Sequence, residues 1–233
     1  MSRFILSFLL IFLSSCDSYS VKQIPVVVPA GLVVPEEMVY IPAGEFIMGN
    51  AEEPRTLGGK RVMSSAYLID RYEVSREGYN KFHPEHSFSL KKARWPVAFV
   101  MFAEAEAFCQ AQGKRLPTEA EWESAAQNIA PGGGNQFDGS TCPRPYPAAP
   151  TDALKQMFGD VWEWTGSAYR PHPGFRAAGG AVGEYNGKFM SGQFVLKGGS
   201  CATPRGHMRA SYRNFFYPHQ RWQFTGLRLA KDL

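Results

Sequence analysis

The sequence predicts one α+β domain that is rich in loops and preceded by a removable leader. Its composition is that of a globular protein, with 44% hydrophobic, 14% aromatic and 20% charged residues. Short strand-like runs and a few helical stretches follow one another from Met38 onward. In the second half, Gly and Pro recur too often for any long element. Residues 16–233 are enough for one sizeable core but not for two enzyme domains.

The first residues, 1–15, have the pattern of a bacterial lipoprotein signal peptide. A short basic start with Arg3 precedes an apolar run at 4–13, which is too short to span roughly 30 Å of hydrocarbon as a helix. The Leu-Ser-Ser sequence before Cys16 resembles a lipobox. We therefore expect lipidation of Cys16, which would anchor the protein to a membrane of the cell envelope on the extracytoplasmic side. The alternative is an ordinary secretory signal in which Cys16 is incidental.

Residues 16–37 are expected to form a tether, because they are polar at first and then rich in Val and Pro. The domain proper is predicted at 38–233. Charges in the whole sequence are nearly balanced, with 25 Lys and Arg against 21 Asp and Glu, and they are scattered rather than clustered. Nucleic acid is therefore not an expected partner.

The first half of the domain carries the clearest strand signals. Strands are expected at 39–41, 45–48 and 67–69, and the Pro-Ala-Gly sequence between the first two favours a hairpin. Ser75 is expected to cap a helix that reaches about Phe82.

Two further helices are expected in the middle of the chain. One covers about 103–112 and stops at the glycine that follows. Thr118 and Glu121 have the spacing of a capping box, in which each side chain bonds to the backbone of the other residue. The helix that Thr118 opens should bury Trp122 and Ala126, which lie four residues apart.

Cysteine usage is compatible with export. Removal of Cys16 leaves three cysteines, so at most one disulfide can form within the chain. Cys142 lies in a Gly/Pro-rich stretch and Cys201 follows a Gly-Gly-Ser turn, which makes these two the expected pair. Cys109 lies within a helical pattern and is expected to be a small buried hydrophobic residue.

Four segments together resemble the formylglycine-generating enzyme (sulfatase-modifying factor) superfamily. They include the Leu-Pro-Thr-Glu-Ala-Glu-Trp-Glu and Gly-Asp-Val-Trp-Glu-Trp motifs, and their order spans almost the whole mature chain. The resemblance implies a compact, loop-rich α+β fold related to C-type lectins. The segments are 38–49, 113–123, 159–164 and 195–200, with 226–230 closing the chain.

The second half is most similar to the C-terminal domain of the ergothioneine-pathway sulfoxide synthases. Those enzymes join a sulfur donor to a methylated histidine with O2 and a non-haem iron. The resemblance implies that Asn214 helps to hold the histidine derivative. Phe216 and Gln220 stand where some members place an acidic and a basic residue for a glutamyl-cysteine donor, which would favour a simple thiol here. The similar segments are 173–175, 183–189, 198–204, 212–216 and 221–224.

The resemblance also implies a substrate-binding cleft in which aromatic side chains stack on the substrate and Arg213 or Arg221 fixes an anionic group. For Trp162 and Ser200 the alternative is an ordinary role in the core and in a turn. The expected cleft residues are Trp162, Tyr185, Ser200, Arg213, Asn214, Arg221 and Trp222.

The metal ligands of the related enzymes are largely missing from this sequence. The sulfoxide synthases take their iron-binding histidines from a separate N-terminal helical domain, and this chain has a leader in that place. Formylglycine-generating enzymes hold copper with two cysteines, whereas only Cys201 occurs after the Gly-Gly-Ser turn. His83 and His86 have a ligand-like spacing, although in a polar loop it is more often coincidental. The identity of a redox metal, Fe or Cu, is therefore left open.

A structural calcium site is the remaining implied metal site. The resemblance places its ligands at Gln156, at the carbonyls of Gly159 and Val161, and at Glu163, all oxygen donors that suit a hard cation. The alternative for Glu163 is a salt-bridged structural carboxylate.

These observations lead to two hypotheses of function. The first is an exported, lipid-anchored member of the superfamily that acts in O2-dependent oxidation or maturation of a sulfur-containing or peptide substrate. The second is a non-catalytic, lectin-like binding or scaffold module of the cell envelope. The expected partner is accordingly a small thiol or peptide substrate, or an envelope protein.

Overall fold

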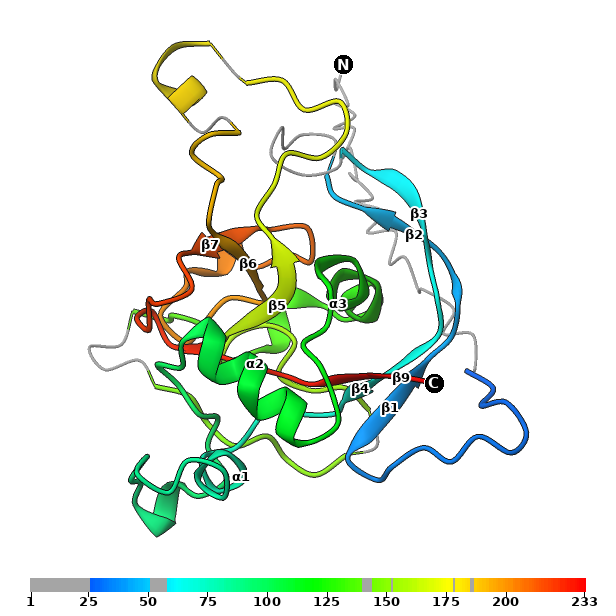
Figure 1. Ribbon diagram of the computed structural model, residues 1–233, viewed down its shortest axis with the longest axis vertical. Coiled ribbons are helices and arrows are strands. Elements are labelled where there is room, and N and C mark those ends of the chain that lie inside the picture. The colour runs from blue at the N-terminus through cyan, green and yellow to red at the C-terminus, as the bar shows by residue number, and fades with distance from the viewer. Residues whose placement is uncertain (1–25, 51–57, 140–143, 152, 178, 185–186) are drawn as a thin grey trace, which may run out of the picture.

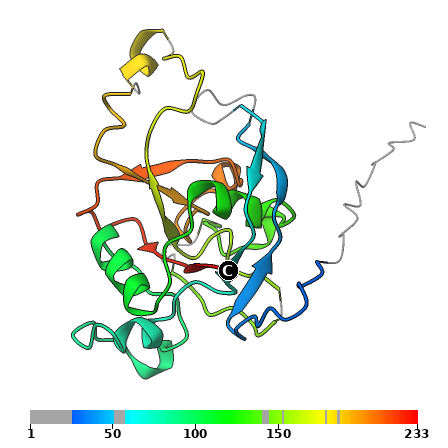
Figure 2. The same ribbon diagram turned by 45° about the vertical axis from the view of Figure 1, so that its right-hand side comes forward.

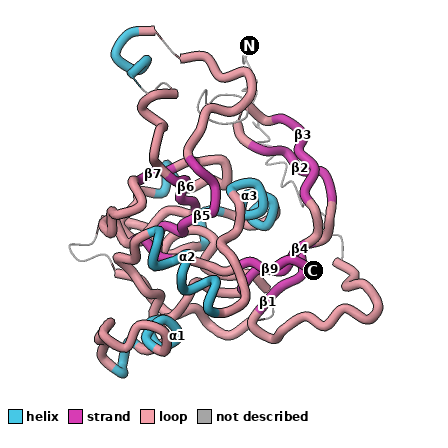
Figure 3. Tube along the Cα trace, viewed as in Figure 1, coloured by secondary structure: helices cyan, strands magenta, loops and turns pink. Residues whose placement is uncertain are grey.

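The computed structural model describes residues 26–50, 58–139, 144–151, 153–177, 179–184 and 187–233. The leader, residues 16–25 of the tether including Cys16, Cys142 and Tyr185 lie outside the described residues, so the predictions for them stay predictions. Within the described ranges, no helix has both the length and the apolar character needed to cross a membrane. Loops connect short elements throughout, as Figure 3 shows.

A four-stranded sheet occupies the centre of the molecule (Figure 1). Its order is β7-β6-β5-β8, with β7 and β5 antiparallel to β6 and β8 parallel to β5. The strands are β5 (Trp162–Ala168), β6 (Phe194–Lys197), β7 (Asn214–Phe216) and β8 (Thr225–Gly226).

The two long helices pack on opposite faces of this central sheet. Trp164 on β5 and Leu196 on β6 are register partners and belong to the main core cluster, together with Phe102 and Phe108 of α2 (Phe102–Ala111). The next register pair, Glu163 and Lys197, points the other way, because neighbouring residues of a strand alternate between faces. These two side chains bond to Trp122 and Glu123 of α3 (Glu119–Ala126).

A second sheet joins the two ends of the domain. Its order is β1-β4-β9, all antiparallel, and it is formed by β1 (Met38–Ile41), β4 (Tyr67–Asp70) and β9 (Ala230–Asp232). The C-terminus therefore lies beside the N-terminal strands of the domain (Figure 1).

The expected hairpin of 39–41 with 45–48 is wrong. β1 pairs with β4, and β2 (Gly44–Met48) pairs with β3 (Lys60–Ser64). Ile41 is opposite Tyr67 while Gly44 is opposite Ser64, so the chain runs straight on from β1 into β2 along one long, bent ribbon (Figure 1). The physical reason is that the Pro-Ala-Gly sequence bends the chain between two pairings without reversing it.

The helix predictions are confirmed, with small differences at the ends. Ser75 caps α1 (Arg76–Asn80), its hydroxyl accepting from the backbone of Gly78, but the helix stops two residues before Phe82. The Thr118 hydroxyl accepts from the Glu121 amide at 3.2 Å, and the Glu121 carboxylate accepts from the Thr118 amide at 2.7 Å. Short 3-10 turns occupy Leu90–Lys92, Pro131–Gly133, Gly180–Glu184 and Arg205–His207.

A long connection between β5 and β6 extends away from the sheets, as both Figure 1 and Figure 2 show in yellow. Where it leaves β5, Tyr169 stacks on Phe215 at 4.5 Å, and Met190, near the returning end, packs in the same cluster. Cys109 is buried in α2, as expected. Cys201 is a buried free thiol, and Cys142, its expected disulfide partner, lies outside the described residues.

Candidate functional site

The face of the central sheet that packs toward α2 brings together three of the expected cleft residues. Trp162 is 5% exposed, and its ring lies 5.9 Å from that of Tyr212. Asn214 begins the edge strand β7, two residues after Tyr212 and on the same face. Phe216, the next residue on that face, contacts Trp222 edge-on at 5.9 Å. We call these five residues, Trp162, Tyr212, Asn214, Phe216 and Trp222, the aromatic face.

Asn214 offers an uncommitted hydrogen-bond donor on the aromatic face. Its side-chain nitrogen is buried and has no hydrogen-bond partner in the described part of the chain. A buried amide nitrogen without a partner costs about 1–3 kcal/mol. A ligand that accepts a hydrogen bond from Asn214 would remove this cost, so the aromatic face favours a ligand with an acceptor group.

The backbone beside the aromatic face is strained. Phe99, Gln223 and Phe224 are non-glycine residues with φ of 64°, 54° and 58°, a conformation that clusters at functional sites. The rings of Phe99 and Phe224 lie 5.1 Å apart. Phe99 is 47% exposed and Trp222 is 52% exposed. This end of the aromatic face therefore presents apolar surface held in a fixed shape, as binding surfaces often do.

The two arginines expected to fix an anionic group are both paired. Arg213 lies on the opposite sheet face, where its Nε is 2.6 Å from Glu119 Oε1 and its guanidinium lies 4.7 Å from the Tyr169 ring. Arg221 donates to Glu104 at 2.9 Å, with a side chain that is 54% exposed. Arg213 is thus committed to the interior, and Arg221 is the accessible arginine of the two.

Glu119 lies at the centre of a group of charged side chains that also contains Arg213, Lys197 and His172. Burial alone would raise the pKa of its carboxyl, but the interaction with His172 and the charges of Lys197 and Arg213 outweigh burial and lower the pKa to about 2. The His172 Nε2 lies 3.7 Å from Glu119 Oε1. Glu119 is therefore ionised at neutral pH and holds Arg213 in place.

Ser200 is a buried turn residue, 1% exposed. Its hydroxyl lies 3.2 Å from the Thr203 hydroxyl and accepts from the backbone of Ala202 at 3.3 Å. These contacts correspond to the turn role that the sequence left open as the alternative. Ser200 and Arg213 are thus separated from the aromatic face, while Tyr185 lies outside the described residues.

The comparison with a protein-family model decides the family. The model of the sulfatase-modifying factor enzyme 1-like domain matches residues 25–153 and 144–233. The chain belongs to this family. The predicted superfamily is therefore confirmed, and so is the loop-rich α+β fold class.

Three named proteins are similar to this chain in sequence or in fold. The chain is 39% identical over 159 residues to the hercynine oxygenase of Mycobacterium tuberculosis, which covers 59% of this chain and 37% of that protein. It is 26% identical over 283 residues to the formylglycine-generating enzyme of Mus musculus, covering 84% and 75%. The structure of PvdO from Pseudomonas aeruginosa shares the fold, with a TM-score of 0.64 at 22% identity over 84% of this chain and 94% of that one. The chain thus aligns with little more than a third of the length of the oxygenase.

The calcium set implied for this family does not fit the geometry around Glu163. The Glu163 side chain is fully buried, and its carboxylate accepts two hydrogen bonds from Arg228, both at 2.9 Å, and one from Trp122 Nε1 at 2.8 Å. A cation would have to displace the Arg228 guanidinium from a site where both side chains are closed to the surface. The structure shows Glu163 as the salt-bridged carboxylate, which was the alternative interpretation.

The nitrogen atoms of the other three expected calcium-binding residues make protein contacts, which leaves the role of their oxygen atoms as calcium ligands a prediction. The Gln156 amide donates to the carbonyl of Tyr146 at 2.9 Å, the Gly159 amide donates to the carbonyl of Gly198 at 3.1 Å, and the Val161 amide donates to Glu73 at 3.1 Å. Across the described ranges, no three His, Cys, Asp or Glu side chains gather into a metal-binding group.

The single cysteine at the copper position of the family is not an exposed redox thiol. Cys201 is 1% exposed, and burial raises the pKa of its thiol to about 12. A thiol with such a pKa is almost entirely protonated at neutral pH and is a poor metal ligand or nucleophile.

His83 and His86 pack around one aromatic ring. Their rings lie 4.9 Å and 5.3 Å from that of Tyr79, and His83 Nδ1 contacts Glu85 at 2.9 Å. The Asn80 amide donates to the carbonyls of both histidines, which holds the loop closed. Packing around Tyr79 therefore explains the three-residue spacing of His83 and His86.

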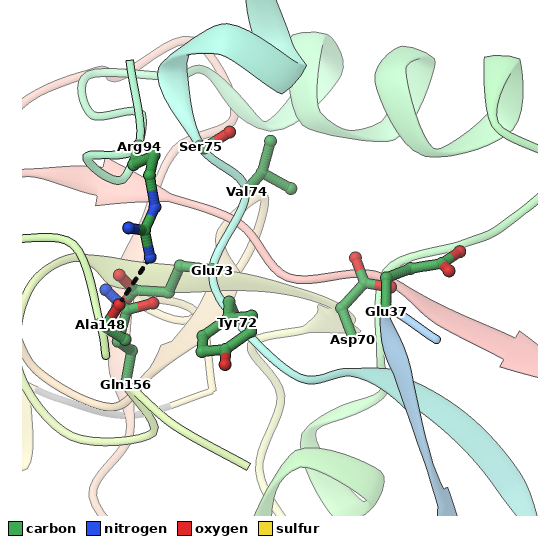
Figure 4. A pocket seen from close by; sticks show the side chains of 9 residues that line it. All are labelled: Glu37, Asp70, Tyr72, Glu73, Val74, Ser75, Arg94, Ala148 and Gln156. Carbon is green, nitrogen blue, oxygen red and sulfur yellow. Dashed lines mark hydrogen bonds between the residues drawn. The ribbon is translucent and has the colours of Figure 1, made fainter. Parts of the chain in front are cut away.

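Of the cavities on the described surface, two are not lined by Trp162, Asn214 or Trp222. One, of about 390 Å³, lies between 168–171 and 187–194. The other, of about 300 Å³, lies next to β4 and contains Glu73 (Figure 4). Sequence reasoning missed Glu73, Glu119 and Arg228. Glu119 and Arg228 stand inside the family motifs, which could have marked both residues as important. The residues that they pair with lie far away in the sequence, so the pairs themselves could not be predicted.

Proposed function

We propose that the aromatic face binds the substrate of an O2-dependent oxidation or maturation step, and that this substrate is a sulfur-containing compound or a peptide. The observation that carries the proposal is the side-chain nitrogen of Asn214, which has no hydrogen-bond partner among the described residues and shares the aromatic face with Trp162, Tyr212 and Trp222. It is supported by the similarity to hercynine oxygenases, whose name gives the class of reaction. We further propose that the mature protein is exported and lipid-anchored through Cys16.

The aromatic face would supply recognition in this reaction. Trp222 offers a half-exposed ring for stacking, and the Asn214 amide donates one hydrogen bond that fixes the orientation of the substrate. Arg221 stands at the exposed edge and can pair with an anionic group if it releases Glu104. A redox metal, which supplies the O2 chemistry in related enzymes, would need ligands from outside the described residues or from a partner protein.

A second candidate is a binding module without catalytic activity. The pairing of Arg213 with Glu119 and the burial of Cys201 favour it, because both residues are occupied by structural contacts. In this case the aromatic face would present Trp222 and Phe99 to an envelope protein or glycan.

The full chain, purified from the membrane of its native host, tests these proposals together. The oxidative proposal predicts stoichiometric Fe or Cu by elemental analysis and O2 uptake with a thiol plus a trimethylated histidine. Metal-free protein that consumes no O2 with any thiol or peptide substrate would contradict it and leave the binding module. Asn214→Ala should weaken substrate binding at least tenfold by calorimetry.

The matched control for this substitution is Asn128→Ala, because Asn128 is an exposed asparagine in the turn that follows α3. Equal affinity of the two variants would contradict the role of the aromatic face. Release of the protein into the soluble fraction by Cys16→Ser would support lipid anchoring, and unchanged membrane attachment would refute it.

A further inference from the structure

Hydrogen bonds hold the walls of the cavity beside β4, and Figure 4 shows one of them, between Arg94 and Ala148. The Tyr72 hydroxyl accepts from the Thr151 amide at 2.8 Å, and the Lys155 amide donates to the Arg71 carbonyl at 2.9 Å. The Arg94 guanidinium, on a third segment, donates to the Ala148 carbonyl at 3.1 Å. Three segments therefore meet around a preformed space of about 300 Å³.

Glu73 is a buried acid on the wall of this space. Its side chain lies with Gln156 and Ala148 on one side of the cavity, as Figure 4 shows. The residue is 5% exposed, and its Oε1 accepts from the Val161 amide at 3.1 Å. Its second oxygen, Oε2, is buried and has no hydrogen-bond partner among the residues that the structure describes. An unmet carboxylate oxygen in a cavity wall is a vacant ligand contact.

The two other acids that line the cavity differ from Glu73, because both are already paired with one lysine. Lys114 lies 3.0 Å from Asp70 and 3.1 Å from Glu37. These pairs leave Glu73 as the lining carboxylate whose contacts are incomplete. The site is therefore selective for a group that reaches Glu73 itself.

We propose that this cavity binds a small organic cation whose ammonium or guanidinium group donates to Glu73 Oε2. Burial and the nearby acids Asp160 and Glu163 raise the pKa of the Glu73 carboxyl, and a cation with a directed N–H donor would favour its ionised form by supplying the charge and the hydrogen bond that it lacks. The space of about 300 Å³ is some ten times the share of one water in the liquid, which suits an organic molecule of several carbon atoms better than a bare ion. Among the described residues, no three acidic, His or Cys side chains gather into a metal-binding group, so an inorganic cation would depend on carbonyl and amide oxygens here.

A strained residue supports this assignment. Gln156, on the wall next to Glu73, has φ of 60° although it is not glycine. Its amide donates to the Tyr146 carbonyl at 2.9 Å, which holds the residue in that conformation. Such strain is maintained where the surrounding structure determines it and is frequent at ligand sites. The site is separate from the aromatic face and does not depend on the oxidative proposal.

The test is calorimetric titration of the full chain with butylamine, using butanol as the uncharged control and calcium chloride as the inorganic arm. Butylamine should bind with one site per chain and raise the melting temperature, while butanol should do neither. Glu73→Gln keeps an acceptor for the Val161 amide and should weaken butylamine binding at least tenfold. Glu36→Gln, at an exposed acid outside the cavity lining, should leave the affinity unchanged.

Three results would overturn the proposal. The first is binding of butanol with the affinity of butylamine, which would show that charge has no part. The second is equal affinity of the Glu73→Gln variant and the unmodified chain for butylamine. The third is calcium binding that depends on Glu73 and excludes butylamine, which would make this an inorganic cation site.

Discussion

The substitution Glu163→Gln tests the buried ion pair between Glu163 and Arg228. The substitution keeps an oxygen for the Trp122 indole but removes the charge that faces Arg228 across two hydrogen bonds of 2.9 Å. Both side chains are 0% exposed, so no water can replace the lost partner. Removal of one member of a buried ion pair costs about 3–5 kcal/mol. For a domain of this size, that corresponds to a fall in Tm of roughly 6–20 °C.

The assay is urea unfolding followed by tryptophan fluorescence, with scanning calorimetry for Tm. Glu45→Gln is the control, because the Glu45–Arg61 pair is exposed and 3.5 Å long, and its loss should cost less than about 1 kcal/mol. EDTA should leave the unmodified chain unchanged. A destabilisation below about 1 kcal/mol in Glu163→Gln, or a fall in Tm on addition of EDTA that Glu163→Gln abolishes, would refute the reasoning and restore Glu163 as a calcium ligand.

Three further predictions concern other parts of the core. The pKa of Glu119 is lowered to about 2 from 4.5, so its contribution to stability is present above about pH 4.5 and is lost as the pH falls toward 2. Glu119→Gln should therefore flatten the dependence of the unfolding free energy on pH in that window, and an unchanged dependence would contradict the ion pair. Iodoacetamide at pH 8 should modify Cys201 roughly a hundredfold or more slowly in the folded chain than in urea, as read by peptide mass spectrometry, whereas equal rates would show an accessible thiolate. Gly159→Ala should destabilise the chain by more than about 2 kcal/mol in urea unfolding, because φ is 94° and the new Cβ would lie 2.1 Å from the Asn135 carbonyl oxygen; Gly132→Ala, in open space, should not.

Local signals in the sequence predicted local structure well. The capping box of Thr118 and Glu121 needs only a spacing of three residues, and it is formed as predicted. The burial of Trp122 follows from the same helix. The resemblance supplied the fold, because strands as short as β7 and β8 have no periodic pattern of their own.

Predictions that depended on distant partners were less complete. The expected hairpin failed because β1 pairs with β4 and not with its neighbour β2. Arg213 was assigned to a substrate anion because nothing in its surroundings in the sequence shows that Glu119, 94 residues earlier, would neutralise it. In the same way, the choice between calcium and a salt bridge at Glu163 depended on Arg228, which is 65 residues away.

The position of the last strands has a consequence for how the chain reaches its native state. β8 pairs with β5 and β9 pairs with β4, so residues 225–232 contribute to both large sheets. Between these strands, Arg228 bonds to Glu163 and to the carbonyls of Asp70 and Lys155. Both sheets therefore stay incomplete until residues 225–232 are available to pair, and such contacts over long sequence separations form slowly. A chain in which this segment is not yet paired leaves the edges of β5 and β4 open to chaperones and proteases.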